Sequence, residues 1–154
     1  QVAMKQDVNL ISVVESALAL VAKQVQEKGL ILKWQRPSKP ISIKGDHFKL
    51  EQLLLNLLVN AISYTEQGAV QLELGKEQGE VLLSVTDTGV GIPEEALPHL
   101  FERFYVVDKS RSRQAGGTGL GLSIVKHIAH LHGASVEVFS RFGFGTKVSL
   151  KFPV

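Results

Sequence analysis

The chain has 154 residues, of which 44% are hydrophobic and 21% are charged, and this balance excludes a disordered segment. The length is sufficient for one domain and too short for two ordinary ones. The formal net charge of +2 is too small to indicate a nucleic-acid partner by itself, and the lack of cysteine excludes disulfides and cysteine-ligated metal sites. The longest apolar run, Leu53 to Ile62, is interrupted by Asn56 and Asn60 and is too short to cross a membrane.

The first half of the chain is predicted to contain two long helices with two short strands between them. Asn9 and Asp46 are good N-cap residues, and Gly29 is a typical helix stop. Apolar side chains recur at helical spacing after each cap and nearly surround the second helix, which indicates that this helix is buried. The expected elements are a helix from Asn9 to about Lys28, strands over residues 30–35 and 41–44, and a helix from Asp46 to about Tyr64.

The second half of the chain is predicted to be rich in hairpins. Alternating apolar residues predict a hairpin of strands around residues 70–74 and 81–85, and a final hairpin of residues 135–139 and 146–152. The expected elements between the two hairpins are a helix start at Pro93-Glu94-Glu95, a mobile loop over residues 106–118 and a third long helix from near Gly119. These elements predict an α+β two-layer sandwich rather than regular βαβ alternation.

A narrow polar stripe crosses the second predicted helix. Gln52, Asn56, Asn60 and Tyr64 recur every four residues on a helix that is otherwise apolar. An unpaired buried amide costs about 1–3 kcal/mol, so these side chains need partners. Either they bond to neighbouring backbone or to each other, or they line a polar ligand or metal site. Neutral amides suit Mg²⁺ that is held mainly by substrate phosphates and waters.

Two glycine-rich motifs follow the polar stripe in the sequence. Asp87-Thr88-Gly89-Val90-Gly91-Ile92 ends a predicted strand, where a carboxylate can accept hydrogen bonds from a ligand amine and the glycines permit close approach of a flat ligand. Gly117-Thr118-Gly119-Leu120-Gly121 opens a predicted helix, whose free N–H groups can bind anions. Each motif alone also fits an ordinary surface turn or a glycine-rich helix cap.

The order of these motifs resembles the catalytic domain of sensor histidine kinases. The N, G1, F and G2 boxes of that family correspond to Asn56 and Asn60, Asp87-x-Gly89-x-Gly91-Ile92, Phe101-Glu102-Arg103-Phe104-Tyr105 and Gly117-x-Gly119-Leu120-Gly121-Leu122. The resemblance covers essentially the whole chain, and residues 101–126 look most like phosphate-regulon-type sensor kinases. It implies a Bergerat-type ATP-binding fold, with a mixed, mostly antiparallel sheet of about five strands packed against three main helices.

The resemblance also implies roles for individual residues. Asn60 would ligate Mg²⁺, Asn56 would lie beside the metal and the phosphates, and Asp87 would accept a hydrogen bond from the amino group of adenine. The other residues implied to bind the nucleotide are Tyr64, Gly89, Gly91, Ile92, Arg103, Lys109, Gly117, Thr118, Gly119, Leu120 and Gly121. The expected cofactors are therefore ATP and Mg²⁺.

The resemblance predicts phosphoryl transfer rather than hydrolysis. Gyrase-type ATPases place a glutamate at the position of Asn56 to activate water, and an amide cannot act as a general base. The γ-phosphoryl group would pass to a histidine on an adjacent dimerisation domain and then to the receiver domain of a response regulator. Residues 1–154 would be the catalytic and ATP-binding domain of a longer sensor kinase, with the dimerisation and phosphoacceptor domain before residue 1. The domain is expected to be cytoplasmic in a membrane-tethered homodimer and to contact neither membrane nor nucleic acid.

Two departures from the family pattern leave an alternative open. Ser63 stands where family members commonly carry lysine, and Val106 stands where many carry arginine; both cations are expected to contact phosphates. Arg103 and Lys109 are among the available replacements. Without replacement, the chain would be a nucleotide-binding pseudokinase or interaction module with weak or no phosphotransfer. A hydrolysing ATPase or a serine kinase is a further alternative, which Asn56 and the F box disfavour.

Overall fold

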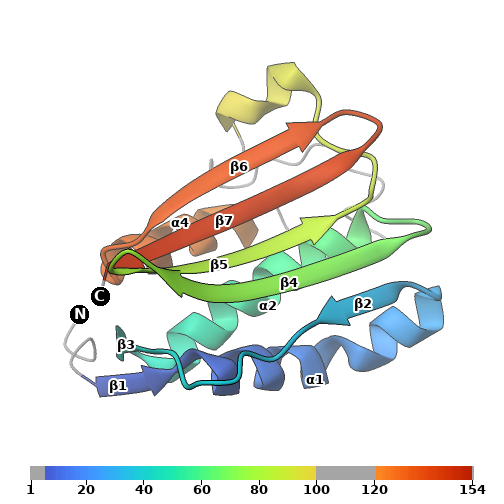
Figure 1. Ribbon diagram of the computed structural model, residues 1–154. Coiled ribbons are helices and arrows are strands. Elements are labelled where there is room, and N and C mark those ends of the chain that lie inside the picture. The colour runs from blue at the N-terminus through green and yellow to red at the C-terminus, as the bar shows by residue number, and fades with distance from the viewer. Residues whose placement is uncertain (1–5, 100–120, 154) are drawn as a thin grey trace.

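The computed structural model describes residues 6–99 and 121–153, which form an α+β fold (Figure 1). The described elements are β1 (Gln6–Asn9), α1 (Leu10–Lys28), β2 (Ile31–Trp34), β3 (Ser42–Gly45), α2 (His47–Ser63), β4 (Ala69–Glu77), β5 (Glu80–Asp87), the 3-10 helix η2 (Glu94–His99), α4 (Gly121–Leu131), β6 (Ser135–Arg141) and β7 (Gly145–Pro153). Within these residues, every helix is too short or too polar to span a membrane.

The main sheet has five strands in the order β2-β4-β5-β7-β6 (Figure 1). β2 runs parallel to β4, and the other neighbours are antiparallel, with β4–β5 and β6–β7 formed as hairpins. A separate two-stranded sheet pairs β1 with β3. The predicted mixed, mostly antiparallel sheet is confirmed, together with both predicted hairpins.

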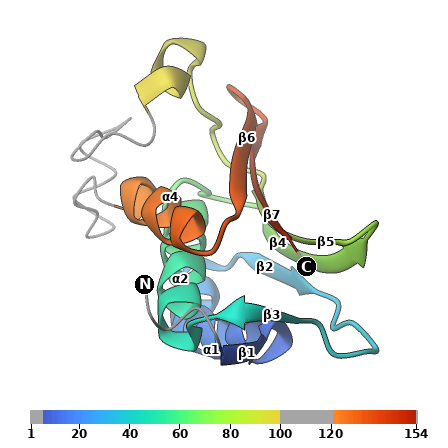
Figure 2. The same cartoon turned by 90° about the vertical axis from the view of Figure 1, so that its left-hand side faces the viewer.

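The helices α1, α2 and α4 cover one face of the main sheet, as Figure 2 shows. α2 lies between α1 and α4 and also contacts β4 and β5. Leu54 and Leu58 of α2 are fully buried, and so are Leu150 and Phe152 of β7. The core thus fills the space between the two layers, which confirms the α+β two-layer sandwich with three main helices and explains why α2 is apolar on nearly every side.

Several bounds differ from those expected from the sequence. The sequence does not predict β1. Its four residues are too few to show a periodicity, and its partner strand lies more than 30 residues away. The helix start at Pro93 opens η2, which contains Pro98 and is a 3-10 helix. The third helix is described from Gly121 onward. The expected loop over residues 106–118 lies outside the described residues.

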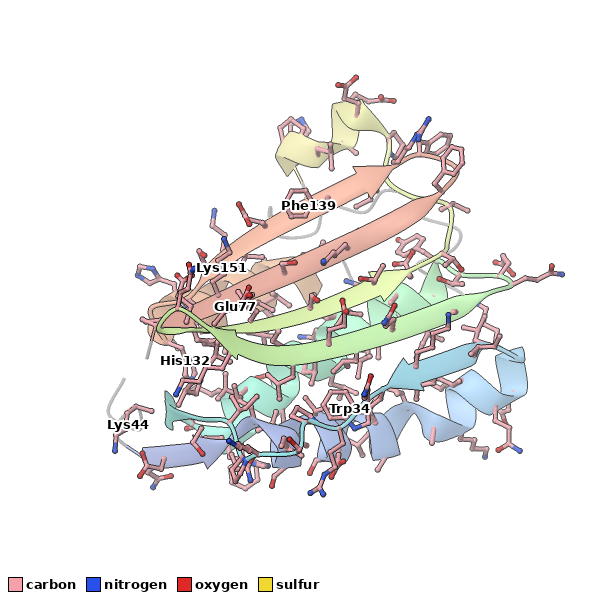
Figure 3. All side chains as sticks on the ribbon, viewed as in Figure 1. Trp34, Lys44, Glu77, His132, Phe139 and Lys151 are labelled. Carbon is pink, nitrogen blue, oxygen red and sulfur yellow. The ribbon has the colours of Figure 1, made fainter. Side chains whose placement is uncertain are left out.

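A buried histidine joins the end of α4 to the start of α2. The Nε2 atom of His132 accepts a hydrogen bond from the backbone N–H of Asp46 at 3.1 Å, and its Nδ1 lies 2.8 Å from the carbonyl oxygen of Ile128. Because a backbone N–H can only donate, Nε2 is the acceptor, and Nδ1 carries the proton and donates to Ile128. A Cβ atom on Gly45 would lie 2.6 Å from this ring, so any other residue there would displace the ring from its hydrogen bonds. Figure 3 shows His132 at the same end of the sheet as Lys44 and Lys151.

The end of α2 is capped by a side chain from α1. The Nζ atom of Lys28 donates to the carbonyl oxygens of Ile62 at 2.6 Å and Ser63 at 3.2 Å. The last carbonyls of a helix have no partners within the helix and carry partial negative charge. The ammonium group therefore satisfies two of them and stabilises the end of α2.

We expect the Lys28→Met variant to unfold more easily than the wild type. Removing a charged donor from helix-end carbonyls should lower the free energy of unfolding by about 1–2 kcal/mol. Lys23→Met is the matched control, because Lys23 lies on the same helix, is 86% exposed and only reaches Glu27 at 4.0 Å. Urea unfolding of the two variants measures the difference, and equal effects of the two substitutions would contradict the capping role.

Candidate functional site

Asn56 and Asn60 lie one turn apart on α2 and are both half-buried. Among the side chains that the structure describes, the Nδ2 atom of Asn56 is the one buried nitrogen or oxygen without a hydrogen-bond partner. Buried amides normally find partners, because leaving one unpaired costs about 1–3 kcal/mol. The orphaned amide therefore favours the reading in which the polar stripe faces a ligand. Gln52, at the other end of the predicted stripe, is exposed.

Tyr64 ends α2 and connects it to the loop after β5. Its backbone N–H donates to the carbonyl oxygen of Asn60 at 3.1 Å, and its own carbonyl oxygen accepts the N–H of Val90 at 3.2 Å. A Cβ atom on Gly89 would lie 2.2 Å from that same carbonyl oxygen. Glycine at position 89 thus lets the loop lie directly against the end of α2, next to the turn that carries Asn60.

Asp87 is the last residue of β5 and is half-buried. Its Oδ1 atom accepts the backbone N–H of Gly89 at 2.9 Å. Burial raises the pKa of the Asp87 carboxyl above its ordinary value, and hydrogen bonds from the backbone N–H groups of Gly89 and Thr146 oppose this rise. The carboxylate can therefore act as an acceptor that is partly removed from water.

Asp87 belongs to a row of polar side chains that crosses three neighbouring strands. It pairs with Thr146 of β7, and Thr146 pairs with Ser140 of β6. The alternate residues Val85 of β5 and Val148 of β7 are buried, and Val138 of β6 is partly buried against the same core. The three polar residues therefore continue the helix-covered face of the sheet at the end where the core stops.

The β6–β7 hairpin holds the loop after Asp87 from one side. Ser140 Oγ accepts the backbone N–H of Ile92 at 2.8 Å. Gly91 has a φ of +76°, and a Cβ atom there would lie 2.2 Å from the carbonyl oxygen of Arg141. A Cβ atom on Gly145 would likewise lie 2.2 Å from the carbonyl oxygen of Asp87. Both glycines are thus required by close backbone contacts between the loop and the hairpin.

β4 holds the same loop from the other side. The backbone N–H of Thr88 donates to the carbonyl oxygen of Ala69 at 3.1 Å, and the N–H of Ala69 donates to Thr88 Oγ1 at 3.0 Å. The loop is therefore fixed by α2, by β4 and by the β6–β7 hairpin at once.

The structure thus brings together seven of the predicted site residues, from α2 and from the loop after β5, and it places Gly121 at the start of α4. The seven are Asn56, Asn60, Tyr64, Asp87, Gly89, Gly91 and Ile92. Six others lie outside the described residues: Arg103, Lys109, Gly117, Thr118, Gly119 and Leu120.

Sequence reasoning did not select Thr146 and Ser140. The sequence Gly143-x-Gly145-Thr146 is typical of a turn in the final hairpin. The alternation of Val136, Val138 and Ser140 could have placed a hydroxyl on the core-facing side. No group of three or more His, Cys, Asp or Glu side chains suited to a metal exists within the described residues.

Substitution by alanine tests whether position 89 requires glycine, with a glycine that has open space around it as the control. Gly89→Ala should lower the free energy of unfolding by about 1–3 kcal/mol, because the new Cβ meets the Tyr64 backbone and the loop must shift. Gly75→Ala on β4 is the matched control, since a Cβ there has nothing within 4 Å. Denaturant unfolding of both variants measures the contrast, and a stable Gly89→Ala variant would refute the close packing.

The raised pKa of Asp87 predicts a specific pH dependence of stability. A carboxyl whose pKa is higher in the folded state destabilises the fold when it is charged, and this cost disappears as pH falls through the raised pKa. The free energy of unfolding of the wild type, minus that of Asp87→Asn, should therefore increase as pH is lowered from neutral. Urea unfolding over a pH series measures it; a difference that stays flat or decreases would show that burial of the charge is not costly.

Comparison with known proteins places this site in a family. Residues 45–154 match the family described as histidine kinase-, DNA gyrase B-, and HSP90-like ATPase. The sensor histidine kinase YkoH of Bacillus subtilis is 43% identical over 148 residues, covering 95% of this chain and 32% of YkoH. YclK, a sensor histidine kinase of the same species, is 37% identical over 151 residues, covering 97% and 32%. The chain thus spans about a third of the length of these relatives.

Solved structures agree with the sequence matches. A structure of the mycobacterial sensor histidine kinase MprB superposes with a TM-score of 0.83 at 27% identity, covering 96% of this chain and 97% of that one. Full-length ShkA in complex with AMPPNP gives a TM-score of 0.80 at 30% identity, covering 96% of this chain and 30% of ShkA. With the matching family model, these likenesses show that the chain belongs to the histidine kinase-, DNA gyrase B- and HSP90-like ATPase family.

Proposed function

We propose that this chain is the catalytic and ATP-binding domain of a longer sensor histidine kinase, which binds Mg·ATP and supplies its γ-phosphoryl group to a histidine on another domain. Two features carry the proposal. One is the half-buried Asp87 carboxylate held by backbone N–H groups, and the other is the orphaned Asn56 amide on α2, the helix whose end contacts the loop after Asp87.

The end of β5 suits the adenine ring. The Asp87 carboxylate is an acceptor for the exocyclic amine, and Gly89 and Gly91 leave the backbone open to a flat ligand. A partly desolvated acceptor discriminates strongly, because a ligand without the matching donor leaves it unpaired. This preference for an amine favours adenine over a purine with a carbonyl at the same position.

The amides of α2 suit the phosphates and their cation. Mg²⁺ needs only one or two protein oxygens when phosphates and waters supply the rest, and Asn60 and Asn56 offer neutral amide oxygens. The cation, when bound, would neutralise charge on the phosphates. The Nδ2 of Asn56 has a hydrogen to donate, and a phosphate oxygen is a suitable acceptor.

The chemistry of Asn56 favours transfer over hydrolysis. An amide cannot remove a proton from water, so the site would hold ATP without activating a hydrolytic nucleophile. Phosphoryl transfer depends mainly on positioning and charge neutralisation, and a histidine nitrogen needs no such base. The bond from the γ-phosphorus to the ADP oxygen would break as the bond to the histidine nitrogen forms.

The partners follow from this reaction and from the length of the relatives. The sensor kinases YkoH and YclK are about three times as long as the matching region, which leaves room for a dimerisation domain with the acceptor histidine. A response-regulator aspartate would receive the phosphoryl group next. We place the domain on the cytoplasmic side of a membrane-tethered homodimer.

Calorimetric titration with Mg·ATP tests the binding site. The wild type should bind saturably, and Asn60→Asp should weaken binding by about tenfold or more, because the new charge repels the phosphates. Gln52→Asp is the matched control, since Gln52 is exposed on the same helix and follows the same stripe. No binding at millimolar ATP, or equal losses in both variants, would contradict the proposal.

Transfer of labelled phosphate separates the kinase from a pseudokinase. With a histidine-containing helical domain from a sensor kinase supplied in trans, the wild type should label the histidine, and Asn60→Asp should label it far more slowly. ATP binding without any labelled histidine would instead support the interaction module. In that case Ser63 and Val106, which stand where family members commonly carry phosphate-binding cations, would account for the lack of transfer.

A further inference from the structure

The hydroxyl group of Ser140 on β6 contacts three polar groups at the edge of the site. Its Oγ accepts the backbone N–H of Ile92 at 2.8 Å, lies 3.1 Å from the carbonyl oxygen of Gly145 and lies 2.8 Å from Oγ1 of Thr146. Ile92 belongs to the loop after β5, whereas Thr146 is the direct cross-strand partner of Ser140. One hydroxyl thus joins the loop, the hairpin backbone and a second hydroxyl.

The number of protons fixes the direction of these hydrogen bonds. A serine hydroxyl has one proton and two lone pairs. The N–H of Ile92 can only donate and takes one lone pair, and the carbonyl of Gly145 can only accept and takes the proton. The remaining lone pair then accepts the hydroxyl proton of Thr146. In the opposite orientation Ser140 donates to Thr146, and the Gly145 carbonyl loses this donor.

The orientation of Thr146 matters because of its neighbour. Thr146 lies directly opposite Asp87 in the β5–β7 register, and side chains paired in this way have Cβ atoms about 4.5–5.5 Å apart. With its proton turned toward Ser140, Thr146 Oγ1 offers only lone pairs on the other side. The Asp87 carboxylate and the Thr146 hydroxyl together then present two acceptors in one row.

We propose that Ser140 is a positioning residue for purine specificity, which acts by holding the Thr146 hydroxyl as an acceptor beside Asp87. The proposal rests on the proposed function, since it concerns the base of the bound nucleotide. A purine with an amino group at position 6 brings N–H donors to these acceptors. A purine with an oxygen at position 6 places an acceptor against these acceptors, which is unfavourable. Ser140 prevents Thr146 from turning its proton toward that oxygen.

The test compares Mg·ATP with Mg·ITP, two nucleotides that differ at position 6 in an amino group against an oxygen. The wild type should bind ATP more tightly than ITP. In Ser140→Ala the freed Thr146 hydroxyl can donate to the oxygen of ITP. The dissociation constant for ITP divided by that for ATP should therefore fall by about five- to tenfold. Ser140→Thr keeps a hydroxyl at the same position and should retain the wild-type ratio. Ser135→Ala, on an exposed position of the same strand, is the matched control.

Thr146→Val provides a second route, because it removes the hydroxyl while keeping the shape of the side chain. It should lower the same ratio, and Ser140→Ala should then add no further change. If either single variant weakens ATP and ITP equally and leaves the ratio unchanged, Ser140 has only a structural role and this inference fails while the proposed function stands. A wild type that binds neither nucleotide overturns the proposed function instead.

Discussion

The burial of the Asp87 carboxylate at the end of β5 is the constraint on which the rest of the site depends. Removing a charged group from water is costly, and the raised pKa of Asp87 reflects that cost. Among the residues that the structure describes, the backbone N–H groups of Gly89 and Thr146 offset it. A ligand that donates a hydrogen bond to this carboxylate would offset part of the cost. The carboxylate thus lowers the stability of the free protein, and a bound donor would raise it again.

The surrounding backbone is arranged to keep this carboxylate in place. Tyr64 joins the loop to the end of α2, and Lys28 stabilises that same helix end from α1. The β6–β7 hairpin fixes the opposite side of the loop through Ser140 and the close approach of Gly145. The helix layer and the sheet are thus linked directly at the site, and Asn56 with Asn60 is carried by the helix that makes this link. A change in either layer would therefore reach the loop after β5 through these contacts.

The elements that the sequence predicts well are those with a strong local signal. α2 has a cap at Asp46 and a long apolar periodicity, and the β4–β5 hairpin alternates cleanly. β1 and the cap from Lys28 could not be predicted, because both depend on contacts between residues more than 30 positions apart. The same applies to the row of Asp87, Thr146 and Ser140, which exists only through strand register. Motif order located the first of these residues but could not locate the other two.

Nuclear magnetic resonance spectroscopy during a titration with Mg·AMPPNP can show whether one ligand contacts both α2 and the loop after β5. We predict that the Asn56 and Asn60 side-chain signals shift saturably, together with the backbone amides of Gly89 and Ile92. The exposed Gln52 amide on the same helix should stay unchanged. Shifts confined to one of the two segments, or no saturable shift at all, would contradict a single nucleotide site between α2 and the end of β5.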